Sequence, residues 1–477
     1  MIRQENDSPA LMGVTIGLAA LCASWFQEVG LQDHTVSSTI QDDYKALVQA
    51  LSLAFDKVVA PGVISTEPEV RQALEAFHQE PIDALLLVHI LWSEDQPLMA
   101  LLEGLPETPV LLWNYYPTKA LPDYLSIPDM FRRSGTVGLL QSSAVLQRRG
   151  VAFDLVTGTP EDEELRRELE EYATALTIRR RLSGMRAGRI AGRCEVMTGT
   201  FVDEQALRAR LGVQLVDITA EEYAACCQQV PEADVEDLCT SLQAQFPLLE
   251  VSAASLRLAC RATLALDILV QQYDLGVLAI QDLDPTLHHL VETRPCLCPP
   301  YCAKHGIPIV MESDLTTGLG LLAATMAAAA PGMYTEIFTF DATTNLLLMG
   351  HAGVHNPALA APGPVRIIPD AEYRYVDAVE GAWFEFILAA GPVTCVSLYD
   401  AGDRYRMITF YGASQGEPLR LEGYAHAVVQ TEVPVTQLLP RLVRRGLTQH
   451  FAVVPGWVAG VLEKWARLAG VEFVLEE

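Results

Sequence analysis

Residues 109–117 read PVLLWNYYP, an apolar strand pattern that ends in a polar and aromatic loop. Further apolar runs precede it, at residues 14–19, 57–60 and 84–88. Amphipathic segments with helical spacing lie between these runs, at residues 42–55 and 67–77. Strands that alternate with helices of this length predict a parallel sheet covered by helices. Because such sheets bind ligands in the loops after their strands, the loop after Trp113 is a candidate binding region.

The pattern predicts a second layer of the same kind and then a different one. A helix is expected to begin at Thr159-Pro160, and α/β alternation resumes after it, with strands predicted at 213–218, 276–280 and 307–311. After about residue 330, short alternating runs predict antiparallel strands. We therefore predict two Rossmann-like parallel α/β domains, residues 1–160 and 161–328, and a C-terminal domain, residues 329–477, that contains an antiparallel β-barrel with a closing helix and strand.

Composition limits the class of protein. The chain has 477 residues, with 33 Lys and Arg against 60 Asp and Glu, and its net charge of −27 would repel a nucleic acid. Its apolar runs are shorter than the roughly 18 residues that a membrane-spanning helix needs, so we predict no membrane partner. The ten cysteines are scattered and do not form a disulfide framework. These features predict a cytoplasmic enzyme.

Polar side chains directly follow predicted strands in the C-terminal third of the chain. The main candidates are Glu312, Asp341, His351 and His450, with Asp314 and His355 nearby. Carboxylates and imidazoles that converge at strand ends are suitable ligands for a divalent metal such as Mn²⁺ or Mg²⁺. Taken one at a time, each of these residues is equally compatible with a solvated strand end.

Three segments that contain these candidate residues together resemble a known metal site. Residues 311–315 (MESDL), 338–341 (FTFD) and 345–351 (NLLLMGH) are similar to the metal-site region of the L-fucose/L-arabinose isomerase family. A later segment, 449–454 (QHFAVV), is similar to the region of the family's C-terminal histidine. The resemblance spans most of the chain and implies a metal-dependent aldose–ketose isomerase that works through a cis-enediol(ate).

The chemistry and the resemblance together assign roles to individual residues. Aldose–ketose interconversion moves a proton between C1 and C2, which two carboxylates can take and return. We expect Glu312 and Asp341 to be catalytic and also to bind the metal, with His450 and His351 as further metal ligands. The expected metal is Mn²⁺, or another divalent metal such as Mg²⁺ or Co²⁺. Substrate-binding residues are expected to be His351, Asn114, Tyr115 and Trp92.

The resemblance also implies an assembly and a range of substrates. It implies a homo-oligomer, a hexamer in the family pattern, with active sites shared between subunits. The substrate is expected to be a monosaccharide: a pentose, a 6-deoxyhexose, or a hexose with a sulfo or phospho group at C6. Residues 19–24 (AALCAS) replace the polar loop of the arabinose branch, and the segment between Asp341 and His351 is shorter than in that branch. These differences leave the sugar open.

Other interpretations of the sequence compete with this one. A non-catalytic sugar-binding or regulatory protein on the same scaffold is the main alternative. Cys296, Cys298 and Cys302, with His305, do not have a standard zinc spacing. The segment 412–416 (GASQG) matches G-x-S-x-G, but a hydrolase elbow requires a helix directly after the serine, and a strand is predicted there instead.

Overall fold

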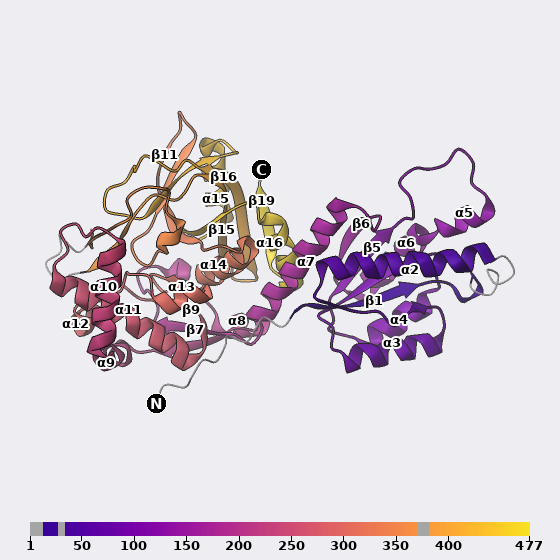
Figure 1. Cartoon of the computed structure of the whole chain (residues 1–477), viewed down its shortest axis with the longest axis horizontal. Helices are drawn as coiled ribbons and strands as arrows, with labels where there is room; N and C mark the ends of the chain where they lie inside the picture. Colours follow the sequence, from indigo (N-terminus) through magenta and orange to yellow (C-terminus); the bar gives the residue numbers. More distant parts are fainter. Residues whose placement is uncertain (1–12, 27–33, 371, 373–380) are drawn as a thin grey trace. The chain divides into compact units, whose positions relative to one another are not determined.

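The computed structural model describes residues 13–26, 34–370, 372 and 381–477. The chain divides into two units, Met1–Thr177 and Ile178–Glu477, which are coloured from indigo to magenta and from magenta to yellow in Figure 1. Each unit has its own sheet system. The predicted three-domain boundaries remain a prediction, because a division into two units does not test them.

The first unit is built on one parallel sheet. Its strands are β1 (Thr15–Leu21), β2 (Lys57–Val59), β3 (Val63–Ile64), β4 (Ala84–His89), β5 (Val110–Tyr115) and β6 (Phe153–Gly158). They lie in the order β2-β1-β4-β5-β6, and β3 also pairs with β1. Strand β4 is buried at every position, as expected for a parallel strand that is covered on both faces.

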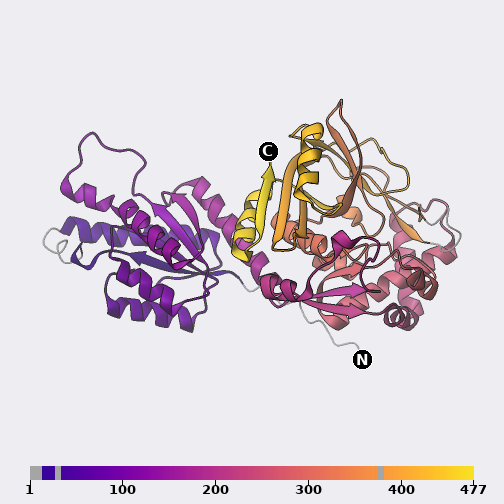
Figure 2. The ribbon, with the colours of Figure 1, turned by 180° about the vertical axis from the view of Figure 1, so that it is seen from behind.

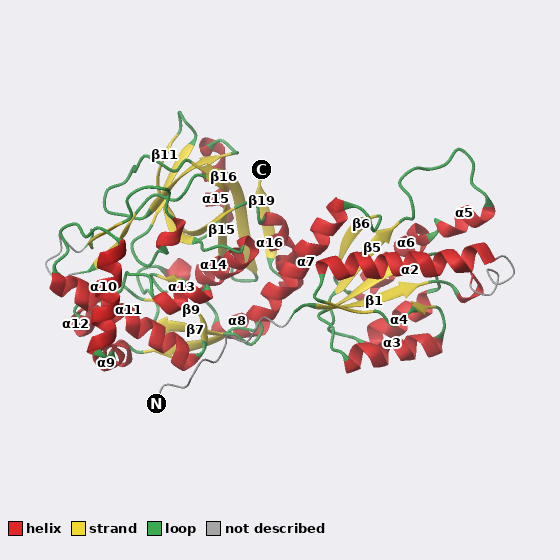
Figure 3. Ribbon diagram, viewed as in Figure 1, coloured by secondary structure: helices red, strands yellow, loops and turns green. Residues whose placement is uncertain are grey.

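Helices alternate with these strands. They are α2 (His34–Ala54), α3 (Glu67–Gln79), α4 (Asp95–Gly104), α5 (Ile127–Arg132), α6 (Gly135–Arg149) and α7 (Glu163–Leu182), whose last residues belong to the second unit. Helix α3 shows why the sequence folds this way. It has Thr66 as N-cap, with Glu69 completing a capping box, and it buries Val70, Ala73 and Phe77, spaced three and four residues apart. Figure 3 shows the resulting alternation of helix and strand.

The second unit begins with another parallel sheet. Its strands are β7 (Arg186–Ile190), β8 (Gln214–Ile218), β9 (Leu275–Ile280) and β10 (Ile309–Val310), in the order β10-β9-β7-β8. Its helices are α8 (Glu204–Leu211), α9 (Ala220–Gln229), α10 (Glu232–Gln245), α11 (Ala253–Tyr273), α12 (Pro285–Val291) and α13 (Pro300–His305). The carboxyl ends of β9 and β10 therefore lie side by side, which brings residues 281–282 and 311–314 together.

A closed barrel of six antiparallel strands follows. Its strands are β11 (Met333–Asp341), β12 (Leu346–Gly350), β15 (Gly391–Asp400), β16 (Tyr405–Ser414), β17 (His426–Thr431) and β18 (His450–Pro455). Their order is β15-β18-β11-β12-β17-β16, and pairing of β16 with β15 closes the barrel. Strand β19 (Glu472–Glu476) adds to β16 in parallel, and β13 (Arg366–Pro369) pairs with β14 (Ala382–Glu385). Figure 2 shows these strands from behind. The predicted fold class, two parallel α/β sheets and then an antiparallel barrel, is confirmed.

Helix α14 (Leu315–Ala328) joins the parallel sheet of the second unit to the barrel. It contacts β9 and β10 on the sheet side and β15 and β18 on the barrel side. Two glycines permit this close approach. A Cβ at Gly318 would lie 2.9 Å from Val277, and one at Gly320 would lie 2.9 Å from Leu398. Two further helices complete the chain, α15 (Val435–Arg445) and α16 (Ala459–Ala469).

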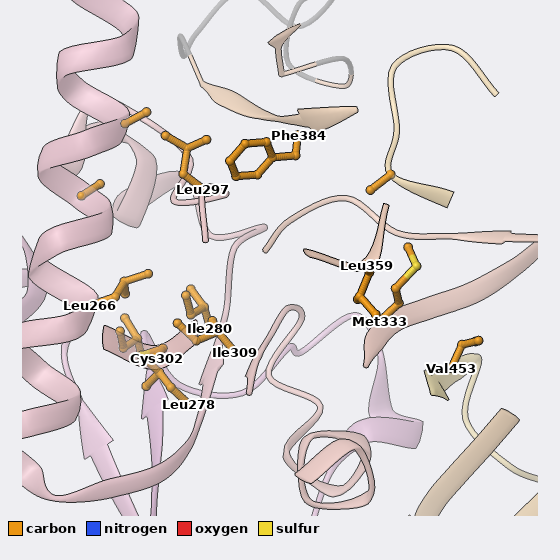
Figure 4. Close-up of a cluster of buried hydrophobic side chains, with 14 of the residues drawn as sticks. Leu266, Leu278, Ile280, Leu297, Cys302, Ile309, Met333, Leu359, Phe384 and Val453 are labelled. Atoms are coloured by element: carbon orange, nitrogen blue, oxygen red, sulfur yellow. The ribbon is translucent and has the colours of Figure 1, made fainter. Parts of the chain in front are cut away.

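One hydrophobic cluster extends from this sheet into the barrel. Figure 4 labels ten of its residues, including Leu278 and Ile280 from β9, Met333 from β11 and Val453 from β18. Because sheet and barrel share a core, residues at their junction are held by both. Among the described residues, no helix is both long enough and apolar enough to cross a membrane.

Candidate metal centre and active site

Glu312, His351 and His450 converge where the sheet of the second unit meets the barrel. Glu312 follows β10, His351 follows β12, and His450 is the first residue of β18. All three are buried, and one ligand atom from each lies within 4.8 Å of the others. Glu312 Oε2 lies 3.0 Å from His450 Nε2, and Glu312 Oε1 lies 3.8 Å from His351 Nε2.

Both imidazoles have one nitrogen engaged by the protein. His351 Nδ1 lies 2.6 Å from the carbonyl oxygen of Ala352, and His450 Nδ1 lies 2.8 Å from Asp314 Oδ2. A carbonyl or carboxylate oxygen accepts a hydrogen bond, so each Nδ1 is the donor. Each Nε2 is then directed at Glu312. This is the arrangement in which proteins hold histidines that ligate metals.

Asp314 is a fully buried carboxylate that orients His450. It also caps α14, since its Oδ1 accepts the backbone N–H of Thr317. The hydroxyl groups of Thr316, Thr317 and Thr448 donate to the same carboxylate. Burial by itself raises the pKa of Asp314, but the hydrogen bond from His450 and those from Thr317 outweigh it and lower the pKa.

The same contacts change the titration of His450. Burial by itself lowers the pKa of an imidazole, but the hydrogen bonds to Asp314 and Glu312 outweigh burial and raise the pKa of His450 to about 9. His450 is therefore protonated at neutral pH in the metal-free protein. A metal ion that binds Nε2 has to displace that proton.

A second carboxylate, Glu336, lies beside this cluster. In the barrel, Glu336 of β11 stands opposite His450 on β18 and opposite Gly350, next to His351, on β12. It is half-buried, and burial raises its pKa, although the fields of His351 and His450 oppose that rise. Glu336 was not among the site residues predicted from the sequence. Tyr334 and Glu336 are two residues apart on a strand and therefore share a face, but the sequence does not show that this face borders the site.

Tyr334 confirms that this face of β11 borders the site. Its ring centroid lies 4.7 Å from that of His351 and 4.7 Å from that of His450. Its hydroxyl donates to the carbonyl oxygen of Met311, the residue before Glu312. Tyr334 is thus part of the packing that holds the two imidazoles.

The structure does not bring Asp341 to this cluster. Asp341 is the last residue of β11, five residues beyond Glu336, which is about 16 Å along a strand. It is exposed, and its carboxylate accepts the backbone N–H groups of Thr343 and Thr344 in the turn to β12. These hydrogen bonds lower its pKa to about 2. The structure does not pair Asp341 with Glu312, because the strand runs away from the cluster, and a catalytic role of Asp341 remains a prediction.

Three of the expected substrate-binding residues lie in the first unit. Trp92 donates its indole N–H to Gln141, and the Asn114 side-chain oxygen accepts a hydrogen bond from Thr136. Tyr115 is buried, and burial, together with the neighbouring Asp43, raises the pKa of its hydroxyl. Their role in substrate binding remains a prediction.

Neither competing motif has the geometry of a site. Cys296, Cys298 and Cys302 are largely buried, and burial raises the pKa of each thiol, that of Cys298 to about 12, which opposes metal binding by thiolate. Ser414 ends β16 and donates to the carbonyl oxygen of Leu388. The next element after it is β17 and not the helix that a hydrolase elbow requires.

The three converging side chains fit a divalent metal. One carboxylate and two imidazoles, held rigidly with Nε2 atoms facing inward, form a mixed oxygen and nitrogen set that suits Mn²⁺, Co²⁺ or a similar ion. Three protein ligands leave positions open for a substrate. Glu336, on the neighbouring strand, supplies a second carboxylate to the same region.

Comparison with known proteins finds relatives among sugar isomerases. No family model matches the chain. A sulfoquinovose isomerase from Priestia aryabhattai is 21% identical over 417 residues, which cover 87% of this chain and 90% of the relative. A sulfoquinovose isomerase from Alkalicoccus urumqiensis is 19% identical, covering 92% of this chain and 96% of the relative. An L-arabinose isomerase from Nocardioides sp. is 25% identical, covering 88% and 85%.

The chain resembles sugar isomerases over most of its length. The predicted resemblance to the L-fucose/L-arabinose isomerase family is thereby confirmed, and with it the predicted class of enzyme, an aldose–ketose isomerase. The matched regions cover 90%, 96% and 85% of these three relatives.

Proposed function

We propose that this protein is a metal-dependent isomerase that interconverts an aldose and a ketose through a cis-enediol(ate). The observation that carries the proposal is the buried cluster of Glu312, His351 and His450, with Glu336 on the adjacent strand. Its relatives' names, sulfoquinovose isomerase and L-arabinose isomerase, support the same reaction class.

The metal is proposed to be Mn²⁺, or another divalent ion such as Mg²⁺ or Co²⁺, held by Glu312, His351 and His450. When bound, such an ion polarises a carbonyl group as a Lewis acid and neutralises the charge that develops on the substrate oxygens. Asp314 keeps the Nδ1 proton of His450 in place, and the Ala352 carbonyl does so for His351. We propose Glu336 in place of Asp341 as a further metal ligand.

Proton transfer is assigned to the two carboxylates. Isomerisation removes a proton from C2 of the aldose and returns one to C1, and a second proton moves from the C2 hydroxyl to the C1 oxygen. Glu312 and Glu336 approach the site from different elements, one from the sheet edge and one from the barrel wall. Because burial raises the pKa of Glu336, its carboxyl group is better matched to accept and return a proton near neutral pH than an exposed glutamate is.

The substrate is proposed to be a monosaccharide, either a pentose, a 6-deoxyhexose or a hexose with a sulfo or phospho group at C6. The relatives' names favour the sulfonated hexose and the pentose over the others. We also propose a homo-oligomer in which Trp92, Asn114 and Tyr115 reach the site of a neighbouring subunit. The support for this assembly is the family resemblance.

A panel of aldoses tests the proposal. Purified protein is stripped with EDTA, reloaded with Mn²⁺, Mg²⁺ or Co²⁺, and incubated with pentoses, 6-deoxyhexoses and C6-sulfonated or phosphorylated hexoses while ketose is measured. We expect ketose from one class of sugar, loss of activity on stripping, and recovery on reloading. Tight sugar binding without conversion by any metal form would contradict the proposal and favour a binding protein.

Metal affinity is expected to rise with pH. Protonated His450 cannot bind a metal through Nε2, and its pKa of about 9 in the metal-free protein lies above neutral pH. Below that pKa, each pH unit lowers the apparent affinity by about tenfold, and above it the dependence levels off. Calorimetric titration with Mn²⁺ at pH 7, 8 and 9 measures this. An affinity that is constant over this range would show that His450 does not compete with a proton.

Replacing Asp314 is expected to weaken the metal centre through His450. In Asp314→Asn the amide has one acceptor oxygen, which cannot replace the carboxylate that accepts from His450, Thr316 and Thr317. We expect Mn²⁺ affinity to fall by roughly 10–100-fold. Calorimetry on the folded variant measures the loss, and unchanged affinity would contradict the orienting role of Asp314.

A further inference from the structure

Glu312 sits in a backbone conformation that side chains rarely adopt. Its φ is 56°, and that of Ser313 is 54°, so two successive residues other than glycine are left-handed. Such a turn persists only where the surrounding structure fixes it. The N–H of Ser313 donates to Ile280 O over 3.0 Å, and its hydroxyl donates to Gly192 O over 2.6 Å. The N–H of Glu312 itself donates to a side chain, Asp282 Oδ1, over 2.8 Å.

Asp282 can accept the N–H of Glu312 because it follows β9, the neighbour of β10 in the parallel sheet. Its side chain is fully buried. Its two oxygen atoms have separate partners: Oδ1 accepts the N–H of Glu312, and Oδ2 accepts Nε and Nη2 of Arg294, at 2.9 and 2.5 Å. Both oxygens of Asp282 therefore accept hydrogen bonds from the protein.

Arg294 in turn is held on its other side. Its guanidinium is 1% exposed. Nη1 lies 2.6 Å from Glu372 Oε2 and 3.5 Å from Asp370 Oδ2, and the group lies 5.8 Å from the ring centroid of Trp383. The planar guanidinium therefore fixes the orientation of the Asp282 carboxylate, which a flexible ammonium group would not.

A buried ion pair of this kind is weak evidence for stability. Removing two charges from water costs free energy that their mutual attraction roughly offsets. Replacing such a pair by apolar residues therefore often leaves the stability of the protein unchanged. Asp282 differs from such pairs because its Oδ1 accepts the backbone N–H of Glu312. The carboxylate of Glu312 faces His351 and His450. The network of Arg294 and Asp282 therefore acts on the backbone that directs the Glu312 side chain.

We propose that Asp282, fixed by Arg294, is a positioning residue that sets the direction of the Glu312 carboxylate and so tunes metal affinity and turnover. This inference rests on the proposed function, since it assumes that Glu312 binds metal. It extends that function to two residues that lie 30 and 18 positions away from Glu312 along the chain.

Asp282→Asn is the direct test. An asparagine has one acceptor oxygen, so it can serve the Glu312 N–H or Arg294 but not both. Co²⁺ is titrated into the metal-free full-length variant, followed by calorimetry and by the visible absorption that reports ligand geometry. We expect affinity to fall by roughly 10–100-fold and the Co²⁺ spectrum to change. At saturating metal, kcat should fall with little change in KM.

Asp267→Asn is the matched control. Asp267 is also a buried aspartate of this unit, and it also accepts backbone N–H groups, those of Tyr301 and Cys302, at 2.9 and 3.0 Å. Those groups begin α13 and are not part of the Glu312 turn. Asp267→Asn should lower the melting temperature while leaving Co²⁺ affinity and spectrum unchanged. Arg294→Lys serves as a second test variant if Asp282→Asn does not fold, and it should show the same changes, smaller in size.

The outcomes separate this inference from the function on which it rests. If the parent protein binds Co²⁺ and Asp282→Asn and Arg294→Lys bind it with the parent's affinity and spectrum, the positioning role is overturned and the metal site stands. If Asp267→Asn loses as much affinity as Asp282→Asn, the effect is general destabilisation, and the inference is again overturned. If the parent binds no divalent metal, the proposed function fails and the inference fails with it.

Discussion

Glu336→Gln should lower kcat by roughly 10²–10⁴-fold in the metal-loaded enzyme. Glutamine keeps the size of the side chain opposite His450 on β18 but cannot accept or return a proton. Glu336 is half-buried, so the change also removes a charge from beside the imidazoles. Initial rates of ketose formation at saturating metal and sugar measure the loss.

Asp341→Asn is the informative comparison. Asp341 lies on the same strand but is exposed, and it accepts only hydrogen bonds of its own turn. An exposed substitution of this kind changes stability by about 0.5 kcal/mol or less, and activity should stay at the parental level. If Asp341→Asn were inactive while Glu336→Gln retained full activity, the assignment from the sequence would hold and that from the structure would fail.

Glu312→Gln should also abolish turnover, with a loss of roughly 10²–10⁴-fold, and should release the metal. Glu312 supplies the carboxylate that lies 3.0 Å from His450 Nε2 and 3.8 Å from His351 Nε2. A neutral amide there is a weaker ligand and not a base. Metal content after dialysis, together with the rate of ketose formation, measures both effects.

Glu292→Gln provides the control for that variant. Glu292 has a φ of 59°, close to that of Glu312, but it is an exposed C-cap of α12. Replacing it tests whether a glutamine in a left-handed backbone position is harmful in itself. We expect full activity and full metal content. Wild-type activity in Glu312→Gln, with Glu292→Gln equally active, would show that Glu312 is not a catalytic residue.

The fold followed from local patterns in the sequence. Apolar runs that alternate with amphipathic segments indicated the parallel sheets, and the change to short alternating runs after residue 330 indicated the barrel. Patterns of this kind report the period of each segment and whether its faces are buried. They say little about where a sheet ends in space. The strand predicted at residues 307–311 is therefore observed only as β10, Ile309–Val310.

The site was harder to predict than the fold, because it depends on the register in which neighbouring strands pair. Glu312 and His450 adjoin strands at ends that meet in space, so strand-end reasoning found them. Asp341 also ends a strand, but that strand runs antiparallel to β18, and its other half faces His450. Sequence alone does not show which end of a hairpin approaches a neighbouring sheet. Glu336 was therefore passed over as an ordinary strand residue.

The residues that hold the candidate metal ligands in place were harder still to predict from the sequence. Asp314 lies two positions from Glu312 and could be suspected, whereas Asp282 and Arg294 acquire their meaning only from contacts across the fold. Asp282 did carry one signal, since it follows the predicted strand 276–280 at the edge where β10 also ends. Arg294 lies in an irregular segment with no periodicity to indicate burial. Its 1% exposure could be learned only from the structure.

The most direct test of metal-dependent enediol(ate) chemistry is proton NMR of the reaction in D₂O. Metal-loaded and EDTA-stripped enzyme are each incubated with the aldose identified from the panel. We expect ketose only with the metal-loaded enzyme, with deuterium entering at C1, because the carboxylates exchange the transferred proton with solvent. Equal conversion by the stripped enzyme would contradict the role assigned to Glu312, His351 and His450. Ketose without deuterium in a metal-dependent reaction would contradict proton transfer by Glu312 and Glu336.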